Sequence, residues 1–204
     1  MSLWAIVPVK PLRRGKSRLS SVLSEDERAV LNYTMLGNTL KTLTQVPEVD
    51  QILVVSRDPS ALALAREYNA RTVQEDGNPG LNLALRRATV VAQVYAVQGV
   101  LILPADLPLI RPTDIQEFIR RAVKPPVMVI APDRHEGGTN ALLVSPPGFM
   151  DYSFGPGSFQ RHIHLAERHD LRVEICRLST IGLDLDLPED LDLLRQMESV
   201  QVEF

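Results

Sequence analysis

An apolar run that ends in a single carboxylate is the feature of this sequence with the clearest chemical meaning. Residues 100–103 are four large apolar residues, and Pro104 and then Asp106 follow them. Such a run predicts a strand buried on both faces of a parallel sheet. Ligands of open α/β sheets bind beyond the carboxyl ends of the strands, so Asp106 is a candidate metal ligand. The alternative is an aspartate in a surface turn between two prolines.

Basic side chains gather in a short segment that follows the first predicted strand. Within it, Gly15-Lys16-Ser17 resembles the end of a P-loop, but that motif requires glycine at position 10, where the chain has lysine. Cations at this edge of a sheet favour a phosphate ligand, and Gly15 would let the backbone approach it closely. We expect Lys16 and Arg18 to contact phosphate, with Lys10 as a third candidate. The alternative is a solvated loop carrying the whole cluster, which comprises Lys10, Arg13, Arg14, Lys16 and Arg18.

Acidic and apolar residues alternate near the end of the chain, over residues 183–187. In a strand, Asp184 and Asp186 would share one face, where like charges repel unless a cation joins them. Asp186 together with Asp106 is therefore a candidate site for Mg²⁺, which takes oxygen ligands, with Asp184 as a helper. The alternative is that acids near the start of a helix are stabilised by its dipole, which accounts well for Asp190.

A glycine-rich turn precedes a predicted helix at residues 155–157. Ser158 is the expected N-cap, and a helix N-terminus with free N–H groups binds carboxylate or phosphate. Gly137-Gly138 permits a tight turn that would present the Thr139 hydroxyl. The alternative is an ordinary capped helix after a loop. The four histidines form no catalytic constellation, and His162 is expected on a solvent or packing face of this helix.

Alternating strands and helices position these candidates. They predict a Rossmann-like three-layer α/β sandwich with a mainly parallel sheet. We expect a single domain over residues 1–204, with 132–180 as an elaboration that covers one side of the site. The expected strands are 3–9, 51–56, 71–74, 100–103, 127–131, 141–144, 173–178 and 183–187. The expected helices are 24–46, 59–69, 81–98, 112–123, 158–169 and one from 188.

Local signals set several of these helix ends. Ser24 with Glu27, and Thr113 with Gln116, fit capping boxes. Gly99 is expected to close the helix before it.

Composition narrows the class of protein. The chain has 204 residues, of which 45% are apolar, and a net charge of −3. These values allow a sizeable core and argue against a nucleic-acid partner, which requires a basic stripe. Cys176 stands alone and is expected to be buried and inert. With no apolar run of membrane length and no leader, we expect a cytoplasmic protein without a membrane partner, and a homodimer is left open.

Together these motifs resemble the nucleotidyltransferases with a GT-A-like Rossmann sheet. Among them, the chain is most similar to the phosphoenolpyruvate / 2-phospho-L-lactate guanylyltransferase family of coenzyme F420 biosynthesis. The resemblance covers essentially the whole chain. The motifs that carry it are Val-Pro-Val-Lys at 7–10, Gly-Lys-Ser-Arg-Leu at 15–19, Gly-Leu-Asn at 80–82, Pro-Ala-Asp-Leu-Pro at 104–108, Gly-Thr-Asn-Ala-Leu at 138–142, Phe-Gly-Pro-Gly-Ser-Phe at 154–159 and Asp-Leu-Asp-Leu-Pro-Glu-Asp-Leu at 184–191.

The resemblance implies a reaction between GTP and a small phosphorylated carboxylic acid, which yields a guanylylated diphosphate diester and pyrophosphate. It also implies a catalytic set of Lys16, Asp106 and Asp186, in which the two aspartates bind Mg²⁺. The implied substrate contacts are Thr139, Gly155 and Ser158 for the acid, and Lys10, Gly15, Lys16, Arg18, Gly80 and Asn82 for the nucleotide.

One departure and two alternatives accompany this assignment. Many sugar nucleotidyltransferases carry a second acid shortly after the mid-chain aspartate, whereas this chain has Pro108, so metal binding depends on Asp186. The alternatives are a molybdopterin or sugar-phosphate nucleotidyltransferase and a non-catalytic nucleotide-binding module. The sequence does not separate phosphoenolpyruvate from 2-phospho-L-lactate as the acid, although we favour phosphoenolpyruvate.

Overall fold

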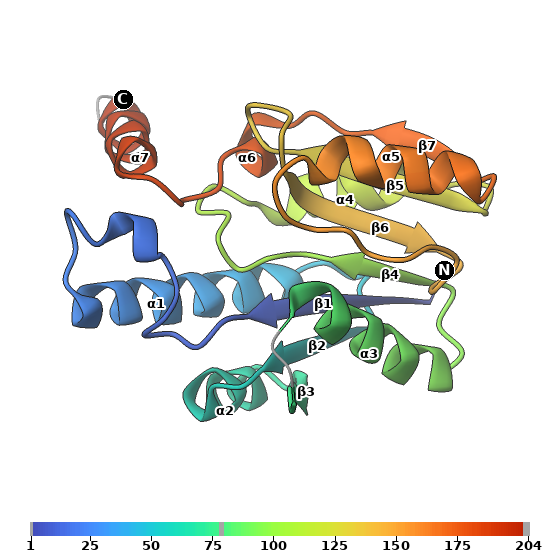
Figure 1. The fold of residues 1–204 in the computed structure, drawn as a ribbon, viewed down its shortest axis with the longest axis horizontal. Coiled ribbons are helices and arrows are strands. Elements are labelled where there is room, and N and C mark those ends of the chain that lie inside the picture. The colour runs from blue at the N-terminus through green and yellow to red at the C-terminus, as the bar shows by residue number, and fades with distance from the viewer. Residues whose placement is uncertain (1, 78–79, 202–204) are drawn as a thin grey trace.

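One twisted sheet forms the centre of the molecule (Figure 1). The computed structural model describes residues 2–77 and 80–201, and within them the strand order is β3-β2-β1-β4-β6-β5-β7. β6 runs antiparallel to β4 and β5, and the other pairs are parallel. The strands are β1 (Leu3–Val9), β2 (Gln51–Ser56), β3 (Arg71–Gln74), β4 (Gly99–Ile102), β5 (Val127–Pro132), β6 (Thr139–Ser145) and β7 (Arg172–Ile175).

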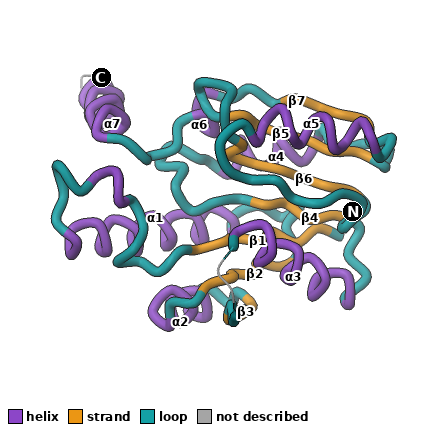
Figure 2. The backbone as a smooth tube through the Cα atoms, viewed as in Figure 1, coloured by secondary structure: helices purple, strands orange, loops and turns teal. Residues whose placement is uncertain are grey.

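Helices cover both faces of this sheet, which confirms the predicted three-layer α/β sandwich (Figure 2). α1, α2 and α4 pack on one face, and α3 and α5 pack on the other. No helix among the described residues is both long and apolar enough to span a bilayer. The helices are the 3₁₀ helix η1 (Ser17–Leu19), α1 (Glu25–Thr44), α2 (Pro59–Glu67), α3 (Leu81–Val94), α4 (Pro112–Arg120), α5 (Ser158–Arg168), α6 (Ser179–Gly182) and α7 (Pro188–Gln201).

The continuous apolar runs of the central strands explain why both faces need a helical layer. Along β1, Ala5 packs in the cluster on the α1 face, whereas Ile6 packs with α3 and α5. Both side chains are fully buried. Burying one large aliphatic side chain stabilises a fold by about 1.5–3 kcal/mol, so these two clusters fix the sheet between its helices.

The antiparallel strand β6 begins where the parallel strands end. Its first residues, Thr139 and Asn140, therefore lie at the carboxyl edge of the sheet, beside the predicted site. The register with β5 shifts here, because Ala131 pairs with Ala141 and Pro132 pairs with Thr139, which leaves Asn140 as the extra residue. A bulge of this kind re-aims side chains. Thr139 reaches α5, whereas Asn140 reaches α6.

The predicted strand at 183–187 is wrong, because this segment crosses the sheet edge as extended chain outside the ladder. The alternation that suggested a strand has another cause. Leu183 and Leu185 are 4% and 1% exposed, so these leucines anchor the segment in the core, and the aspartates that alternate with them are left to bind Asn140 and Lys16. Residues 132–180, expected as an elaboration, supply β6, α5 and β7.

Several predicted helix and strand ends also move. The capping box of Ser24 with Glu27 is confirmed. The box predicted for α4 is wrong, because Pro112 already stands in the first turn and Asp114 accepts from the Arg111 N–H at 3.0 Å instead. Likewise α3 ends before Gly99, which opens β4.

The cap predicted for α5 is also wrong. Gly157, with φ of 74°, is the N-cap, and Ser158 is the first helical residue. β7 ends before Cys176, which is buried as expected.

Candidate functional site

Three segments that are distant in sequence meet at the carboxyl edge of the sheet. The Lys16 ammonium lies 3.1 Å from Asp106 Oδ2 and 3.0 Å from Asp186 Oδ1. The lysine side chain is 6% exposed, whereas the two aspartate side chains are 31% and 42% exposed. The predicted metal aspartates therefore do converge on one point, and a cation from the protein itself lies between them.

Backbone conformation and backbone hydrogen bonds position the three segments that meet here. Lys16 adopts the left-handed conformation with φ of 56°, which turns the chain into η1 and costs a non-glycine residue about 1 kcal/mol or more. The loop after β4 is tied to β1 where the Leu103 N–H bonds to Ile6 O. The Asp106 carbonyl accepts from the Leu185 N–H at 3.0 Å, which joins the two aspartate segments.

Electrostatics at this point favour a charged lysine. Burial works against the ammonium, but the charges of Asp106 and Asp186 outweigh it and hold the pKa of Lys16 above its ordinary value. Burial, followed by the charge of Asp106, raises the pKa of Asp184 to about 6. Asp184 accepts from Asn140 Nδ2 at 3.3 Å, so it faces a different partner from its neighbour Asp186.

Asp190 positions Asp186, a role that the sequence analysis missed. Its carboxylate is buried, and Oδ2 accepts from the N–H groups of Asp186 at 2.9 Å and Leu187 at 2.6 Å. Oδ1 pairs with Arg134 at 2.7 Å. The helix dipole explains why an acid is favourable in the first turn of α7. Asp190 is also in the third helical position, where an acid that accepts from the N-cap amide forms half of a capping box. That signal was present in the sequence.

Asn140 anchors the chain that leads to the acidic segment. Its side-chain amide donates to Ile181 O at 2.9 Å and to Gly182 O at 3.2 Å. Because the amide spans β6 and α6, no local pattern in the sequence points to this contact.

The two hydroxyls predicted to bind the acid substrate lie together beside a buried histidine. Ser158 Oγ donates to Thr139 Oγ1 at 3.0 Å, and Thr139 Oγ1 lies 3.0 Å from His162 Nδ1. The Ser158 N–H bonds to Gly155 O at 2.9 Å, so this amide is not available to a ligand. His162 is fully buried, so the expectation of a solvent or helix-packing position gives way to a core position in a polar network.

The loop before α5 is held by three side chains from two helices, α5 and α3. The Ser153 N–H donates to His162 Nε2 at 3.0 Å, and Arg161 donates to both Ser153 Oγ and Ser153 O at 2.8 Å. From α3, Asn82 exchanges two hydrogen bonds with the Phe154 backbone, at 2.8 and 3.3 Å. The residue expected near the nucleoside thus also supports the loop expected to bind the acid.

The glycines of the predicted site have different reasons for their small size. A Cβ at Gly15 would lie 2.5 Å from Asn32 Nδ2, so packing against α1 explains this glycine. Gly155 has φ of 119°, which only glycine adopts readily. Gly80 is extended at the start of α3, with open space around it.

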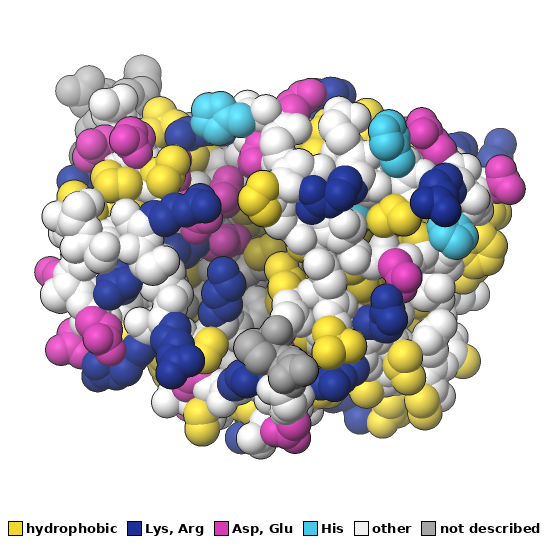
Figure 3. All heavy atoms as spheres, in the orientation of Figure 1, with side chains coloured by type: hydrophobic (Ala, Val, Ile, Leu, Met, Phe, Trp, Pro, Cys, Tyr) yellow, Lys and Arg dark blue, Asp and Glu magenta, His cyan; other side chains and the backbone are white. Residues whose placement is uncertain are grey.

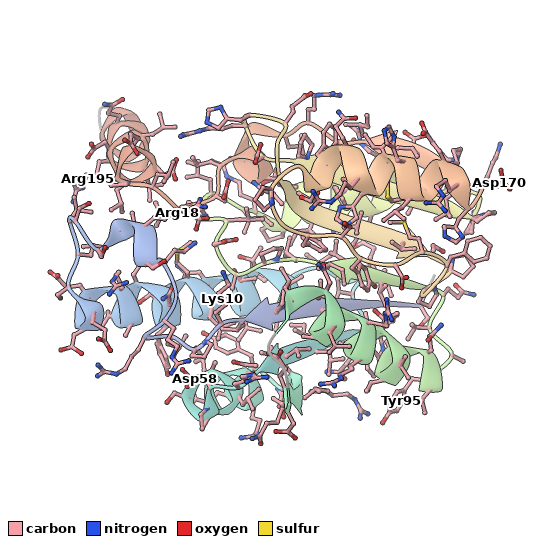
Figure 4. The ribbon with its side chains drawn as sticks, viewed as in Figure 1. Lys10, Arg18, Asp58, Tyr95, Asp170 and Arg195 are labelled. Atoms are coloured by element: carbon pink, nitrogen blue, oxygen red, sulfur yellow. The ribbon has the colours of Figure 1, made fainter. Side chains whose placement is uncertain are left out.

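The remaining predicted nucleotide contacts lie in the open. Figure 4 shows Lys10 just beyond β1 and Arg18 beside the segment that leads into α7. The Arg18 side chain is 67% exposed and lies 3.9 Å from Asp186 Oδ2. Figure 3 shows acidic and basic side chains gathered beside a hollow on this face. Both arginine and lysine are therefore accessible to an anionic ligand.

A separate cavity of about 440 Å³ lies under the loop that precedes β6. Its walls include Pro132, Leu178, Leu183 and Leu193. None of the predicted site residues lines it, so we do not include it in the candidate site.

Comparison with known proteins agrees with this geometry. The profile of a family described as "Guanylyl transferase CofC like" matches residues 3–197. The chain belongs to this family. A relative from Rubrobacter xylanophilus, named phosphoenolpyruvate guanylyltransferase, is 43% identical over 201 residues, which cover 98% of this chain and 97% of the relative. A relative from Methanocaldococcus vulcanius, named 2-phospho-L-lactate guanylyltransferase, is 36% identical and covers 91% of this chain and 81% of the relative.

Solved structures confirm the fold of this CofC-like chain. A putative nucleotide-diphospho-sugar transferase from Desulfovibrio desulfuricans superimposes with a TM-score of 0.76 over 97% of this chain and 88% of the other. At 17% sequence identity, this likeness concerns the fold alone. It supports the predicted GT-A-like nucleotidyltransferase sheet.

Removal of the Asp190 carboxylate tests its positioning role. We expect Asp190→Ala to lower the free energy of unfolding by about 1–3 kcal/mol, because the partly buried amides of Asp186 and Leu187 lose their acceptor. The free energy of unfolding of Asp190→Asn should lie between those of Asp190→Ala and the wild type, since asparagine keeps one acceptor oxygen. Urea denaturation at neutral pH measures this, with Asp192→Ala as the control because that side chain is 67% exposed on the same helix. Equal stability of Asp190→Ala and the control would contradict the role.

Burial of His162 predicts a pH-dependent stability. Burial, helped by the charge of Arg161, lowers the pKa of His162 to about 4 in the folded protein, from its ordinary value of 6.5. Between pH 4 and pH 6.5 the unfolded chain binds a proton on His162 that the folded protein does not bind. The contribution of His162 to the free energy of unfolding is therefore complete above pH 6.5 and is lost as the pH falls toward 4. Its full size is about 3 kcal/mol. Unfolding free energies across this window should vary less in His162→Gln than in wild type, whereas the exposed His164→Gln should follow wild type.

Proposed function

We propose that this protein transfers GMP from GTP to phosphoenolpyruvate and releases pyrophosphate, as a step of coenzyme F420 biosynthesis. The observation that carries the proposal is the convergence of Asp106, Asp186 and Lys16 on one point at the carboxyl edge of the sheet. Membership of the CofC-like family and 43% identity to a relative named for this reaction support it.

The two aspartates are suited to Mg²⁺. Each carboxylate contacts the Lys16 ammonium through one oxygen, so its other oxygen would be available to a divalent ion beside the lysine. Among the described residues no group of three acidic, histidine or cysteine side chains is placed to hold a metal ion by itself, and Mg²⁺ commonly uses one or two carboxylates together with substrate phosphates. When bound, the ion would neutralise the triphosphate and polarise the reacting phosphoryl group.

The chemistry needs little else from the protein. The acid's phosphate is the nucleophile, and with a second pKa of about 6 it is largely dianionic at neutral pH. One of its oxygens forms a bond to the α-phosphorus of GTP as the bond from that phosphorus to pyrophosphate breaks, so no proton has to be removed. The absence of a general base from the proposed catalytic set is consistent with this route.

Lys16 would stabilise the charge of the leaving pyrophosphate. An ammonium group carries three donors, and Lys16 uses two of them on Asp106 and Asp186. One donor is left for a phosphate oxygen. Arg18 is exposed near Asp186, and Lys10 is exposed just after β1, so both would add long-range attraction for GTP.

The acid substrate would bind at the start of α5. Thr139 and Ser158 supply hydroxyls there, and the positive end of the helix dipole favours a carboxylate or phosphate. Gly155 shapes the turn, because glycine adopts a φ of 119° without strain, whereas a residue with a side chain would be strained there.

The activity is tested by pyrophosphate release with GTP, Mg²⁺ and each of the two acids in turn. With both acids at equal concentration, mass spectrometry of the products then reads the preference. We expect the phosphoenolpyruvate adduct to dominate. A dominant product two hydrogens heavier would assign 2-phospho-L-lactate, and no pyrophosphate with either acid would exclude the reaction.

The aspartates should be indispensable in this assay. We expect Asp106→Asn and Asp186→Asn each to lower kcat/KM on the order of a thousandfold, because each removes a ligand of the cation that stabilises the transition state. Asp170→Asn is the matched control, since Asp170 lies at the opposite end of the molecule (Figure 4). Circular dichroism checks that the variants fold. Turnover close to wild type in either variant would remove that residue from the metal site.

Lys16 should contribute through GTP and pyrophosphate. We expect Lys16→Ala to weaken GTP binding, measured by calorimetry, and to slow pyrophosphate release on the order of a hundredfold, as for loss of a charge-assisted hydrogen bond or two. Lys41→Ala, at an exposed position near the end of α1, should change neither. If GTP binds Lys16→Ala and Lys41→Ala with equal affinity, Lys16 pairs with the two aspartates in the free enzyme but does not contribute to GTP binding.

A further inference from the structure

We propose that His162 is a positioning residue for the acid substrate, which acts by orienting the Thr139 hydroxyl and the backbone at Ser153. The proposal rests on the proposed function, because that function assigns the acid to Thr139. His162 would not contact the acid itself, since it is fully buried behind these two residues.

The ring of His162 uses both of its nitrogens. Nε2 lies 3.0 Å from the Ser153 N, and Nδ1 lies 3.0 Å from Thr139 Oγ1. The ring is also held from the side, in an edge-on contact with Phe154 at 4.8 Å between centroids. One side chain on α5 thus connects the start of β6 with the loop before α5.

The partners of His162 determine its tautomer. A backbone N–H can only donate, so Nε2 must accept from Ser153 and carries no proton. The proton of the neutral ring is then on Nδ1, which donates to Thr139 Oγ1. The ring is therefore fixed in one protonation state and one orientation.

This assignment leaves a free donor on Thr139. Its oxygen accepts from His162 Nδ1–H and from Ser158 Oγ–H, so the hydroxyl hydrogen of Thr139 itself is used by neither bond. A hydroxyl whose acceptor positions are filled in this way presents its hydrogen in a fixed direction. A carboxylate or phosphate oxygen is the natural acceptor for it, which matches the charge of the proposed acid substrate.

The same histidine orders the loop that carries Gly155. Ser153 is bound at every polar group, with its N–H on His162 and its carbonyl and hydroxyl on Arg161. Arg161 is at the surface and His162 is in the core, so consecutive residues of α5 hold the loop from outside and inside. Loss of the inner contact would loosen the acid-binding loop without touching the Lys16 centre.

Steady-state kinetics of two variants test the proposal. His162→Phe keeps a planar ring but removes both hydrogen bonds, and we expect it to raise KM for phosphoenolpyruvate about tenfold or more, with KM for GTP changed by less than about twofold. His162→Asn keeps an amide donor near the position of Nδ1 and should recover part of that loss. His164→Phe, on the exposed side of the same helix, is the matched control and should behave as wild type.

A double-mutant cycle separates positioning from general packing. Thr139→Val alone should raise KM for the acid, and adding His162→Phe to it should raise KM by a smaller factor than it does in wild type, because the two residues act through one bond. Factors that multiply fully, or equal rises in the two substrates' KM values, would overturn the proposal. Thermal melts accompany each variant, and if His162→Phe does not fold, His162→Asn in the same cycle decides.

The proposed function and this inference fail in different ways. If the wild-type protein releases no pyrophosphate with either acid, the function is wrong. If the wild type is active and His162→Asn and His162→Phe both leave KM for the acid unchanged, the function stands and the positioning role is wrong.

Discussion

Two carboxylates that converge on one point repel each other, and the arrangement of the active edge depends on the cation that relieves this repulsion. In the free protein that cation is Lys16, whose ammonium lies about equally close to Asp106 and Asp186. Burial of the lysine works against this attraction, but the charges of the two aspartates outweigh it. The consequence of the attraction is spatial. Segments 90 and 170 residues away from Lys16 in the chain are brought to one point. A triphosphate that enters this point adds negative charge and therefore requires a further cation, which is the physical argument for Mg²⁺.

The antiparallel strand β6 links this charged centre to the acid-binding half of the site. Because β6 runs against its neighbours, its first residues lie where the parallel strands end, and the bulge there sends Thr139 and Asn140 in different directions. Thr139 reaches the hydroxyl and histidine network of α5, whereas Asn140 reaches the segment that carries Asp184. Two consecutive residues thus serve two halves of the site. A shift of one residue in this register would exchange their roles and disconnect both halves.

The sheet itself is shared far more widely than this edge. A solved relative with 17% identity has the same fold, so the strand order alone does not choose a substrate. Substrate selection depends on the loops at the carboxyl edge of the sheet. In this chain these are the loop after β1, the turn into β6 and the loop into α5, and each is ordered by its own contacts. Asp133, for example, accepts from the N–H groups of Gly137 and Gly138 and so forms the turn that precedes Thr139.

Features that depend on a local pattern of residues could be predicted before the structure was known. Apolar runs predicted the strands and the three-layer sandwich. The single carboxylate after one run predicted Asp106, and the alternation of acidic and apolar residues over 183–187 predicted Asp186, because both signals lie in the types of neighbouring residues. The contacts of the site residues depend on segments that meet only in the folded protein. Lys16 was expected on phosphate but lies between the aspartates, Ser158 was expected to cap a helix but bonds to Thr139, and residues 183–187 were expected in the sheet but lie outside it. His162 and Asn140 gave no local signal at all. His162 contacts Thr139, 23 residues away, and Asn140 contacts Ile181, 41 residues away, so their roles arise from contacts that exist only once the chain has folded.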